Sequence, residues 1–501
     1  MLDDQAAPVA DRDGPGTGTG TKPGPEPEPH AGTPARAKGM LLVAMAATFM
    51  AMMDSYIVNV AIPSIRTDLG ASVSAAEMTV AGYILIYGLF LVTGGRLGDI
   101  VGYRRMFLTG LSLFTAASLA CGIAPNPETL IVFRCAQGLA AALFFPQILS
   151  IIQTTFDGTR RDKALALFGV TIGLAAISGQ LIGGILVHLD LFGWGWRPIF
   201  LVNLPLGLAT IAGAALTMPG IKGTHRPRLD LPGVGLLTAA LLLLTFPLAE
   251  GRTADWPAWC FVMMALSVPF FIAFGRWELR LSARGGQPLI SPSLLRLRGY
   301  RSGNAVFLAF FAGNAGLFFV LAVQLQSGLG YSAIESGLLF APLGIAFTAV
   351  SLYVPKLMPR LGLHILTAGY GINALGYLAL LLTAWAAGDD MSGPMLVPAL
   401  VVIGIGQGLG VSPLLGTALA EVPPTEAGSA AGVLETMGQL GMTIGITLVG
   451  LLYFTTLGET PGRHDYAEAF TVTLVLNLAL SLLAMLCVPP LRRAAAAATA
   501  A

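Results

Sequence analysis

The chain has 501 residues, of which 55% are hydrophobic and only 11% are charged. Soluble domains carry about 25% charged residues, so this composition excludes a mainly soluble protein and predicts an all-α polytopic membrane protein. The formal net charge of +1 gives no strongly basic surface, and no nucleic-acid partner is expected.

The first segment, residues 1–39, is rich in Pro, Gly, Thr and acidic residues and has almost nothing to bury. This composition predicts a disordered cytoplasmic tail. The apolar run that follows, 40–65, is too long for the core of a signal peptide and predicts the first spanning helix. About twenty apolar residues cross a bilayer as a helix. On this scale we predict fourteen spans, at 40–65, 78–98, 106–124, 129–154, 164–188, 198–218, 231–249, 257–277, 304–326, 336–357, 364–387, 395–420, 428–454 and 469–488.

The distribution of basic residues predicts the orientation of these spans. If both termini are cytoplasmic, the outer loops hold only Arg66, Arg197, Arg252 and Arg463, and Arg134 lies inside the membrane. Every other Lys and Arg then lies on the inner side. Cytoplasmic loops of membrane proteins carry such an excess of Lys and Arg, so we predict a multi-pass protein with both ends inside the cell.

The chain also repeats itself at an offset of 260 residues, which places Asp54 opposite Asn314. At a slightly different offset, Gln137 matches Gln407. Parallel repeats that enclose a cavity at the membrane midplane are typical of transporters. We therefore predict a 6 + 2 + 6 plan. It consists of a six-helix bundle at 40–218, a two-helix insertion with cytoplasmic linkers at 219–302, a second six-helix bundle at 303–490 and a cytoplasmic tail at 491–501.

A short, charged, glycine-rich turn at 94–107 separates the second and third spans. Asp99, Arg104 and Arg105 mark a membrane surface, because charges are costly in hydrocarbon. Gly95 allows close approach at a helix end, and Gly102 can take the positive φ of a tight reversal. Asp99 can accept hydrogen bonds from the amino end of a neighbouring helix. We expect it to dock on the thirteenth span, 428–454, and to hold the outward-facing state. A plain hairpin would explain the arginines alone, but the order of all five residues favours a gating loop.

Three charges lie inside the predicted membrane region, and such charges are functional candidates by default. Asp54 lies roughly 21 Å from the inner surface, at 1.5 Å per helical residue. Arg134 lies about 8 Å below the outer face of a core about 30 Å thick. The depths coincide, so an Asp54–Arg134 pair or a shared water cavity is geometrically possible. Glu435 lies in the inner half of its span, where it can bind a cationic substrate or a proton, or make a packing hydrogen bond.

Asp54 is suited to carry a proton. Burial favours the neutral form of a carboxylic acid and a nearby guanidinium favours the ionised form, so a conformational change that alters either one loads or releases H⁺. A purely structural salt bridge is the alternative. Asn59, five residues further on, can extend a polar lining or make a helix–helix hydrogen bond.

The fifth span carries a dense glycine motif at Gly179, Gln180, Gly183 and Gly184. Glycines at this density let helices touch at the backbone, either for rocking or for close packing alone. No phosphate-binding loop with Lys and Ser/Thr is present, and the histidines and cysteines lack the spacing of metal ligands. We therefore expect no enzymatic activity, no cofactor and no metal.

Together these residues resemble the major facilitator superfamily and, within it, the fourteen-helix drug:proton antiporters. The stretch from Gly95 to Arg105 is similar to the superfamily's loop between helices 2 and 3. Arg134-x-x-Gln137-Gly138 is similar to its helix 4 motif, whose arginine is implicated in proton transfer. The stretch 179–184 is similar to the antiporter motif of helix 5, with Gln180 where the family usually has Pro. The stretches 54–63 and 196–207 resemble motifs of the fourteen-helix branch.

This resemblance implies a fold of fourteen transmembrane helices around a central cavity in a bacterial inner (plasma) membrane. It implies proton-coupled efflux of amphipathic small molecules, such as antibiotics or toxic metabolites, by alternating access. Asp54 and Arg134 would couple protons, and Asn59, Gln137, Asn314 and Glu435 would line the substrate cavity. The expected partners are a small-molecule substrate, protons and membrane lipid.

Two other functions stay open at this point. One is a nutrient or metabolite uptake symporter of the same superfamily, and the other is a non-transporting membrane sensor or assembly factor. The extra central helix pair and the first-helix motif favour the exporting branch, and no soluble signalling domain supports a sensor.

Overall fold

The computed structural model describes residues 34–156, 158–190, 193–218, 229–251, 254, 256–458 and 462–500. Within them the chain is almost entirely helical. The amino-terminal helices are α1 (Pro34–Leu69), α2 (Val73–Val101), α3 (Tyr103–Gly122), α4 (Pro127–Thr155), α5 (Gly158–Leu189), α6 (Pro198–Leu201) and α7 (Asn203–Thr217). The middle pair is α8 (Leu231–Glu250) and α9 (Ala258–Ala283). The carboxyl-terminal helices are α10 (Arg298–Val323), α11 (Ala333–Leu361), α12 (His364–Ala387), α13 (Gly393–Ala418), α14 (Ala427–Leu457) and α15 (Arg463–Ala500).

Helices of this length follow from the sequence, because hydrocarbon offers no partner for backbone N–H and C=O groups. In the described residues, 13 helices contain an apolar stretch long enough to cross a membrane. In α5 the described apolar stretch, Lys163–Ala175, is shorter than that. The predicted multi-spanning helical fold is confirmed, while the total of fourteen spans stays a prediction.

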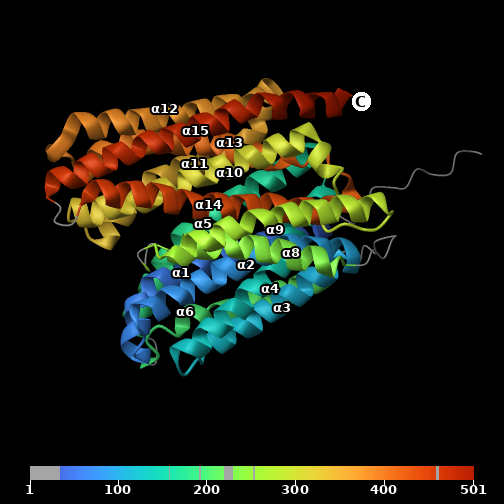
Figure 1. The fold of residues 1–501 in the computed structure, drawn as a ribbon, viewed down its shortest axis with the longest axis horizontal. Coiled ribbons are helices and arrows are strands. Elements are labelled where there is room, and N and C mark those ends of the chain that lie inside the picture. Colours follow the sequence, from blue (N-terminus) through green and yellow to red (C-terminus); the bar gives the residue numbers. More distant parts are fainter. Residues whose placement is uncertain are drawn as a thin grey trace, which may run out of the picture.

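The same helix pairings occur twice. α1 packs on α5 and α7, and α4 packs on α2 and α3. Correspondingly, α10 packs on α14 and α15, and α13 packs on α11 and α12. In Figure 1 the carboxyl-terminal helices α10 to α15 lie above the blue and cyan helices α1 to α4. The internal repeat of the sequence therefore has a counterpart in the packing.

The middle pair α8–α9 lies at the junction of these two groups. α8 packs on α9 and also contacts α2 and α14, one helix from each group. The green α8 and α9 lie in front of this junction in Figure 1. The face of α9 is largely uncovered, with Phe261, Val268 and Ile272 about half exposed, as expected for a helix that faces lipid.

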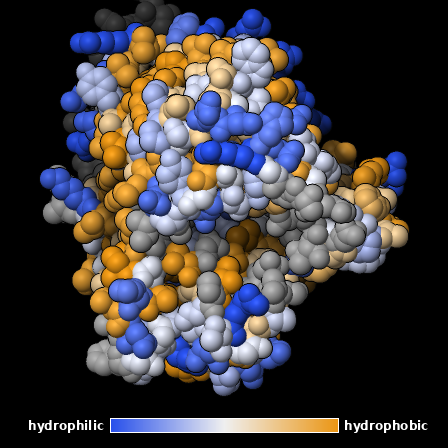
Figure 2. Space-filling view, turned by 90° about the vertical axis from the view of Figure 1, so that its left-hand side faces the viewer, coloured by the Kyte–Doolittle hydropathy of each residue, from blue (hydrophilic) through white to orange (hydrophobic). Residues whose placement is uncertain are grey.

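The two groups contact each other in the half of the molecule that contains the α2–α3 turn. Gly95 of α2 meets the backbone of Gly428 on α14, and Gly432 of α14 meets Leu91. On the other side, Gly173 of α5 lies against Phe347 of α11. Figure 2 looks onto the opposite end of the bundle, where hydrophilic side chains occupy much of the middle and hydrophobic ones the flanks, and this end is hollowed. This conformation is closed at the α2–α3 end.

Candidate functional site

The most distinctive site is an ion pair in the interior of the amino-terminal group. Asp54 lies midway along α1 and Arg134 near the start of α4. Arg134 Nη1 lies 2.6 Å from Asp54 Oδ2, and both side chains are fully buried. A buried ion pair is held only if further hydrogen bonds satisfy its remaining polar atoms.

Three helices supply those hydrogen bonds. Asp54 Oδ1 accepts from Gln137 Nε2 of α4 at 2.9 Å and from Asn203 Nδ2 of α7 at 2.7 Å. Ser118 Oγ of α3 accepts from both amides, at 3.2 and 3.0 Å. The Asp54 carboxylate thus receives three charge-assisted or amide hydrogen bonds, which stabilise its negative charge in this conformation.

Arg134 is fixed as firmly as its partner. Its Nε donates to the Thr79 carbonyl at 3.0 Å and its Nη1 also donates to Gln137 Oε1 at 2.7 Å. The ring of Tyr83 lies 4.3 Å from the guanidinium carbon, and the ring of Phe200 lies 5.6 Å away on a different helix. Arg134 Nη2 is buried without a hydrogen-bond partner in the described residues.

The glycine motif of α5 lies against the same part of α1. A Cβ at Gly179 would meet the Met53 carbonyl at 2.8 Å, and one at Gly183 would meet Ile57 at 2.9 Å. Gly184 faces Val60 at 3.8 Å. These glycines bring the α5 backbone directly onto the turns of α1 that hold Asp54.

The carboxyl-terminal group has an uncharged counterpart of this site. Asn314 of α10, which the repeat places opposite Asp54, accepts a hydrogen bond from Gln407 Nε2 of α13 at 3.2 Å. The residue of α13 that corresponds to Arg134 is Gly404, whose Cα packs against the Leu343 carbonyl. The carboxylate–guanidinium pair is thus replaced by two amides.

A second site joins the two groups at the closed end. Asp99, in the last turn of α2, accepts hydrogen bonds from the backbone N–H groups of Gly428 and Ser429, both at 3.0 Å. These groups belong to the first turn of α14, where N–H groups have no intrahelical acceptor and attract a negative charge. Tyr103 Oη donates to Asp99 at 2.9 Å, and Arg96 lies 3.9 Å away.

The other residues predicted for this loop take distinct positions. Gly102 has φ +102° and connects α2 directly to α3, so it adopts the backbone of a tight reversal. Arg104 Nη2 donates to the Ala215 carbonyl at the end of α7, at 2.8 Å. Arg105 is exposed. Gly95 lies where a side chain would collide with the Gly428 backbone.

Glu435 lies apart from the ion pair, on the turns of α14 that face α2. It is partly buried and close enough to Tyr87 of α2 to act electrostatically on its hydroxyl. That hydroxyl is buried without a hydrogen-bond partner in the described residues. Of the other predicted cavity and motif residues, Asn59 lies on α1 and Gln180 on α5, but their side chains fall outside the described part of the chain.

Sequence reasoning did not assign a role to Ser118, Tyr83 or Asn203. Asn203 falls inside the 196–207 motif, which provided a signal but no function. Ser118 and Tyr83 are ordinary residues of apolar helices, and nothing in their spacing distinguishes them. Only the packing of α2, α3 and α7 around α1 brings them to the ion pair.

A family model described as Major Facilitator Superfamily matches residues 44–446. The chain belongs to the Major Facilitator Superfamily. The superfamily's fold is also found in solved structures that resemble this chain. The human organic anion transporter MFSD10 (TETRAN) has a TM-score of 0.61 at 15% identity, over 89% of this chain and 99% of that one. The proton:xylose symporter XylE has a TM-score of 0.59 at 14% identity, over 89% and 95%.

Curated superfamily members with similar sequences carry names that refer to antibiotics. A probable actinorhodin transporter of Streptomyces coelicolor is 42% identical, over 86% of this chain and 75% of its own length. The cephamycin export protein CmcT of Amycolatopsis lactamdurans is 36% identical, over 88% and 91%. The puromycin resistance protein pur8 of Streptomyces alboniger is 33% identical, over 86% and 85%. The predicted resemblance to drug efflux transporters is confirmed, and this superfamily member is a transporter rather than an enzyme.

Proposed function

We propose that this superfamily member exports amphipathic antibiotic-like molecules in exchange for protons that flow inward. The observation that carries the proposal is the fully buried Asp54–Arg134 pair, in a chain whose relatives are named as antibiotic exporters and resistance proteins. A charged pair inside the membrane is costly, so its presence in a transporter favours a role in coupling over a role in stability.

Coupling follows from the exchange of partners around Asp54. In the closed conformation Arg134, Gln137 and Asn203 stabilise the carboxylate. When α5 and α7 move relative to α1, donors are lost and the carboxyl group becomes accessible, so a proton replaces the lost hydrogen bonds. The proton leaves when the donors return. Each transport cycle thus takes up and releases one proton at this position.

The Asp99 contact supplies the gate of this cycle. Two backbone N–H groups of α14 bind the Asp99 carboxylate while the α2–α3 end is closed. With both termini in the cytoplasm of a bacterial cell, this closed end is the inner one and the conformation faces outward. Release of Asp99 from α14 lets the amino-terminal six-helix bundle rock against the carboxyl-terminal one, with α8–α9 as the insertion between them.

The substrate class is inferred from chemistry that the relatives share by name. Three relatives are named after three different antibiotics, which are actinorhodin, cephamycin and puromycin. This variety supports a cavity that selects for amphipathic character rather than for one chemical scaffold. Asn59, Gln137, Asn314 and Glu435 are the polar residues that we assign to that cavity. Glu435 beside the Tyr87 hydroxyl offers the charged contact.

The test is efflux from a drug-sensitive bacterial host that expresses the chain or its Asp54→Asn variant. We expect resistance and dye efflux in the wild type, both abolished by an uncoupler, and no more than vector-level efflux in Asp54→Asn at equal expression. The matched control is Asp390→Asn, the same substitution at an exposed acid, which should retain efflux. Wild-type efflux by Asp54→Asn would remove this acid from the mechanism. Uncoupler-sensitive accumulation instead of efflux would identify an uptake symporter.

A further inference from the structure

Two buried carboxyl groups meet where the middle helix pair begins and ends, a site that the transport cycle does not use. Asp230, directly before α8, is 7% exposed and Glu278, near the end of α9, is 4% exposed. Asp230 Oδ1 accepts from the Gly233 backbone N–H at 3.1 Å, and Trp277 Nε1 lies 3.0 and 2.9 Å from the two Asp230 oxygens. Glu278 Oε2 accepts from the Ile290 backbone N–H at 2.9 Å.

The two carboxyl groups converge on one point. A Cβ at Gly233 would contact both of them, with Glu278 Oε1 at 2.6 Å. Glu278 Oε1 is buried without a hydrogen-bond partner in the described residues, and Asp230 Oδ2 is the other oxygen at this point. Two carboxylate oxygens form a hydrogen bond only if a proton lies between them. The geometry therefore contains a place for one proton.

No positive charge in the described part of the chain neutralises this pair. None of the ion pairs found there includes Asp230 or Glu278. Arg280 of α9 and Arg284, which follows this helix, are exposed. Within the described residues, Asp230 is the charged side chain that acts on Glu278. Two ionised carboxylates buried together would repel strongly, which one shared proton prevents.

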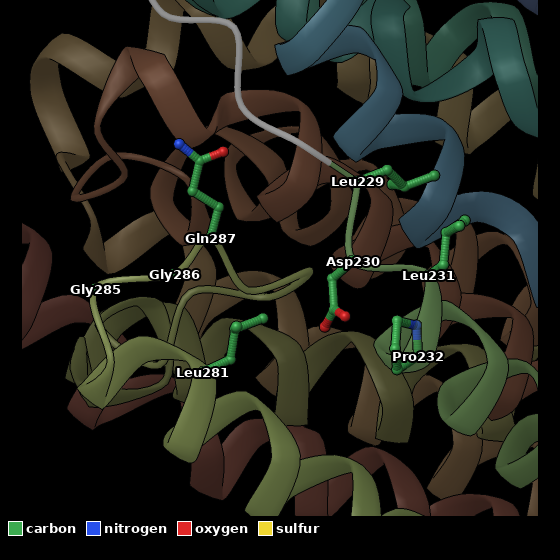
Figure 3. A pocket seen from close by; sticks show the side chains of 8 residues that line it. All are labelled: Leu229, Asp230, Leu231, Pro232, Leu281, Gly285, Gly286 and Gln287. Carbon is green, nitrogen blue, oxygen red and sulfur yellow. The ribbon is translucent and has the colours of Figure 1, made fainter.

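A cavity lies next to the pair and reaches Asp230. Its volume is about 590 Å³, and it is lined by Asp230 together with Pro232, Leu281 and Gln287. Figure 3 shows the Asp230 carboxylate between Leu281 and Pro232, with Gln287 on the loop that follows α9. Water in this cavity can deliver or accept a proton.

The segment held by Glu278 also touches the gate. Ser429 Oγ of α14 donates to the Leu289 carbonyl at 3.0 Å. The backbone N–H of the same Ser429 donates to Asp99 Oδ2 at 3.0 Å. A chain of hydrogen bonds therefore runs from Glu278 through the 289–290 segment to the first turn of α14 and the Asp99 carboxylate.

We propose that Asp230 and Glu278 form a proton-binding site whose single shared proton holds the 289–290 segment on α14 and so keeps the gate closed. The gate itself belongs to the proposed function, on which this part rests. When the proton leaves into the cavity, the two carboxylates repel, Glu278 moves away and Ile290 loses its acceptor. The segment then loosens from Ser429, and the Asp99 contact weakens.

Trp277 provides a direct reporter of the site, because its indole N–H binds Asp230. The fluorescence emission of the wild type minus that of Trp277→Phe gives the contribution of Trp277 alone. We expect this contribution to change over one proton-binding transition as the pH rises. Glu278→Gln should remove the transition, because the Gln amide can donate to Asp230 and accept from Ile290 at every pH. Asp230→Asn, an independent variant, should do the same. An unchanged transition in both variants overturns the proposal. A response to Mg²⁺ at fixed pH that both variants lose would instead assign the site to a metal ion.

The effect on the gate is measured with spin labels at the exposed positions Val101 and Pro423, which flank it, in a variant without the four cysteines. We expect their distance to increase in the wild type over the same pH range and to stay at the closed value in Glu278→Gln. Asp99→Asn separates the two proposals, because it should increase the distance at every pH. If Asp99→Asn has no effect, the gate proposal fails. If it opens the gate while the wild type shows no pH response, only the link to Asp230 and Glu278 fails.

Discussion

At the scale of single residues, the Asp54 site is defined by hydrogen bonds to both oxygens of a buried carboxylate. Arg134 donates to one Asp54 oxygen, and the Gln137 and Asn203 amides donate to the other. Both amides also donate to the Ser118 hydroxyl. Removing any one donor leaves a carboxylate that water or a proton must stabilise instead. This connection between hydrogen bonding and protonation is what makes the site suitable for exchange.

A second ion pair, at the carboxyl end of α1, is partly exposed to solvent. Asp68, at the end of α1, accepts from Arg197 Nη1 at 2.6 Å and from Trp196 Nε1 at 2.9 Å. The hydrogen bond from Arg197, then that from Trp196, holds the pKa of Asp68 below its ordinary value. The pair is partly exposed, with 46% of the Asp68 side chain accessible, so solvent screens it.

We predict that Asp68→Asn destabilises the carboxyl end of α1 by only about 0.5 kcal/mol near neutral pH, as is typical of exposed pairs. Because the folded-state pKa is lowered, the stabilisation is present above the ordinary Asp value of about 3.9 and is lost as the pH falls through the folded-state value. Thermal unfolding is measured in detergent at about pH 7 and about pH 3. The unfolding temperature should therefore fall more in the wild type than in Asp68→Asn when the pH is lowered. The exposed Asp390 serves as the control position, and an identical pH response in all three proteins would contradict the prediction.

Part of the charged site could be predicted from sequence. Asp54 and Arg134 stand out because charges are rare in apolar spans, and the regular rise of a helix places them at one depth. Ser118, Tyr83 and Asn203 could not be found in this way. Their cost in a membrane is small, so their importance arises only when α2, α3 and α7 pack around α1.

At the scale of helices, the contact between α2 and α14 depends on glycines that face each other. Gly95 and Gly428 meet backbone to backbone, and Gly432 meets Leu91 in the same way. This close approach brings Asp99 within reach of the α14 amino end. The sequence predicted the turn and the positive φ of Gly102, because both are local. It did not locate the partner of Gly95, which is more than 300 residues away.

We predict that Gly95→Ala opens this contact, because the added Cβ would collide with the Gly428 backbone. Overpacking of this kind costs about 1–3 kcal/mol, which corresponds to an about 5- to 150-fold shift between closed and open conformations. The distance between spin labels at Val101 and Pro423 should increase, and efflux should fall.

Gly88→Ala is the matched control on the same face of α2. A Cβ at Gly88 would lie 3.6 Å from Gln439, an ordinary contact, so this variant should keep the closed distance and most of the efflux. Equal behaviour of the two variants would show that close packing at Gly95 has no role in closure.

At the scale of the whole molecule, the two helix groups share one packing plan but differ in chemistry. The amino-terminal group contains Asp54 and Arg134, whereas the carboxyl-terminal group contains the Asn314–Gln407 pair, with Gly404 at the position of the arginine. The repeat in the sequence predicted both the duplication and the replacement of Asp by Asn. The fold was the most predictable property, because span length and motif order depend on sequence alone.

We predict that moving the acid to the other group does not restore transport. The double variant Asp54→Asn with Asn314→Asp places a carboxyl group where no guanidinium is present, so it lacks the partner that stabilises the ionised form. Uncoupler-sensitive efflux should stay at the level of Asp54→Asn alone. Recovery of efflux would show that the position of the acid matters less than its presence anywhere along the pathway.

The uncharged amide pair of the carboxyl-terminal group has a consequence for engineering. If the energy of the proton gradient enters through one lobe only, the other lobe is free to vary with the cargo. A chimera that joins α1–α7 of this chain to the last six helices of an exporter for another antibiotic should then keep the same dependence on the proton gradient while its resistance spectrum follows the donor. Duplication followed by the loss of one charged pair would in this way have separated proton coupling, in one half of the molecule, from substrate selection in the other half.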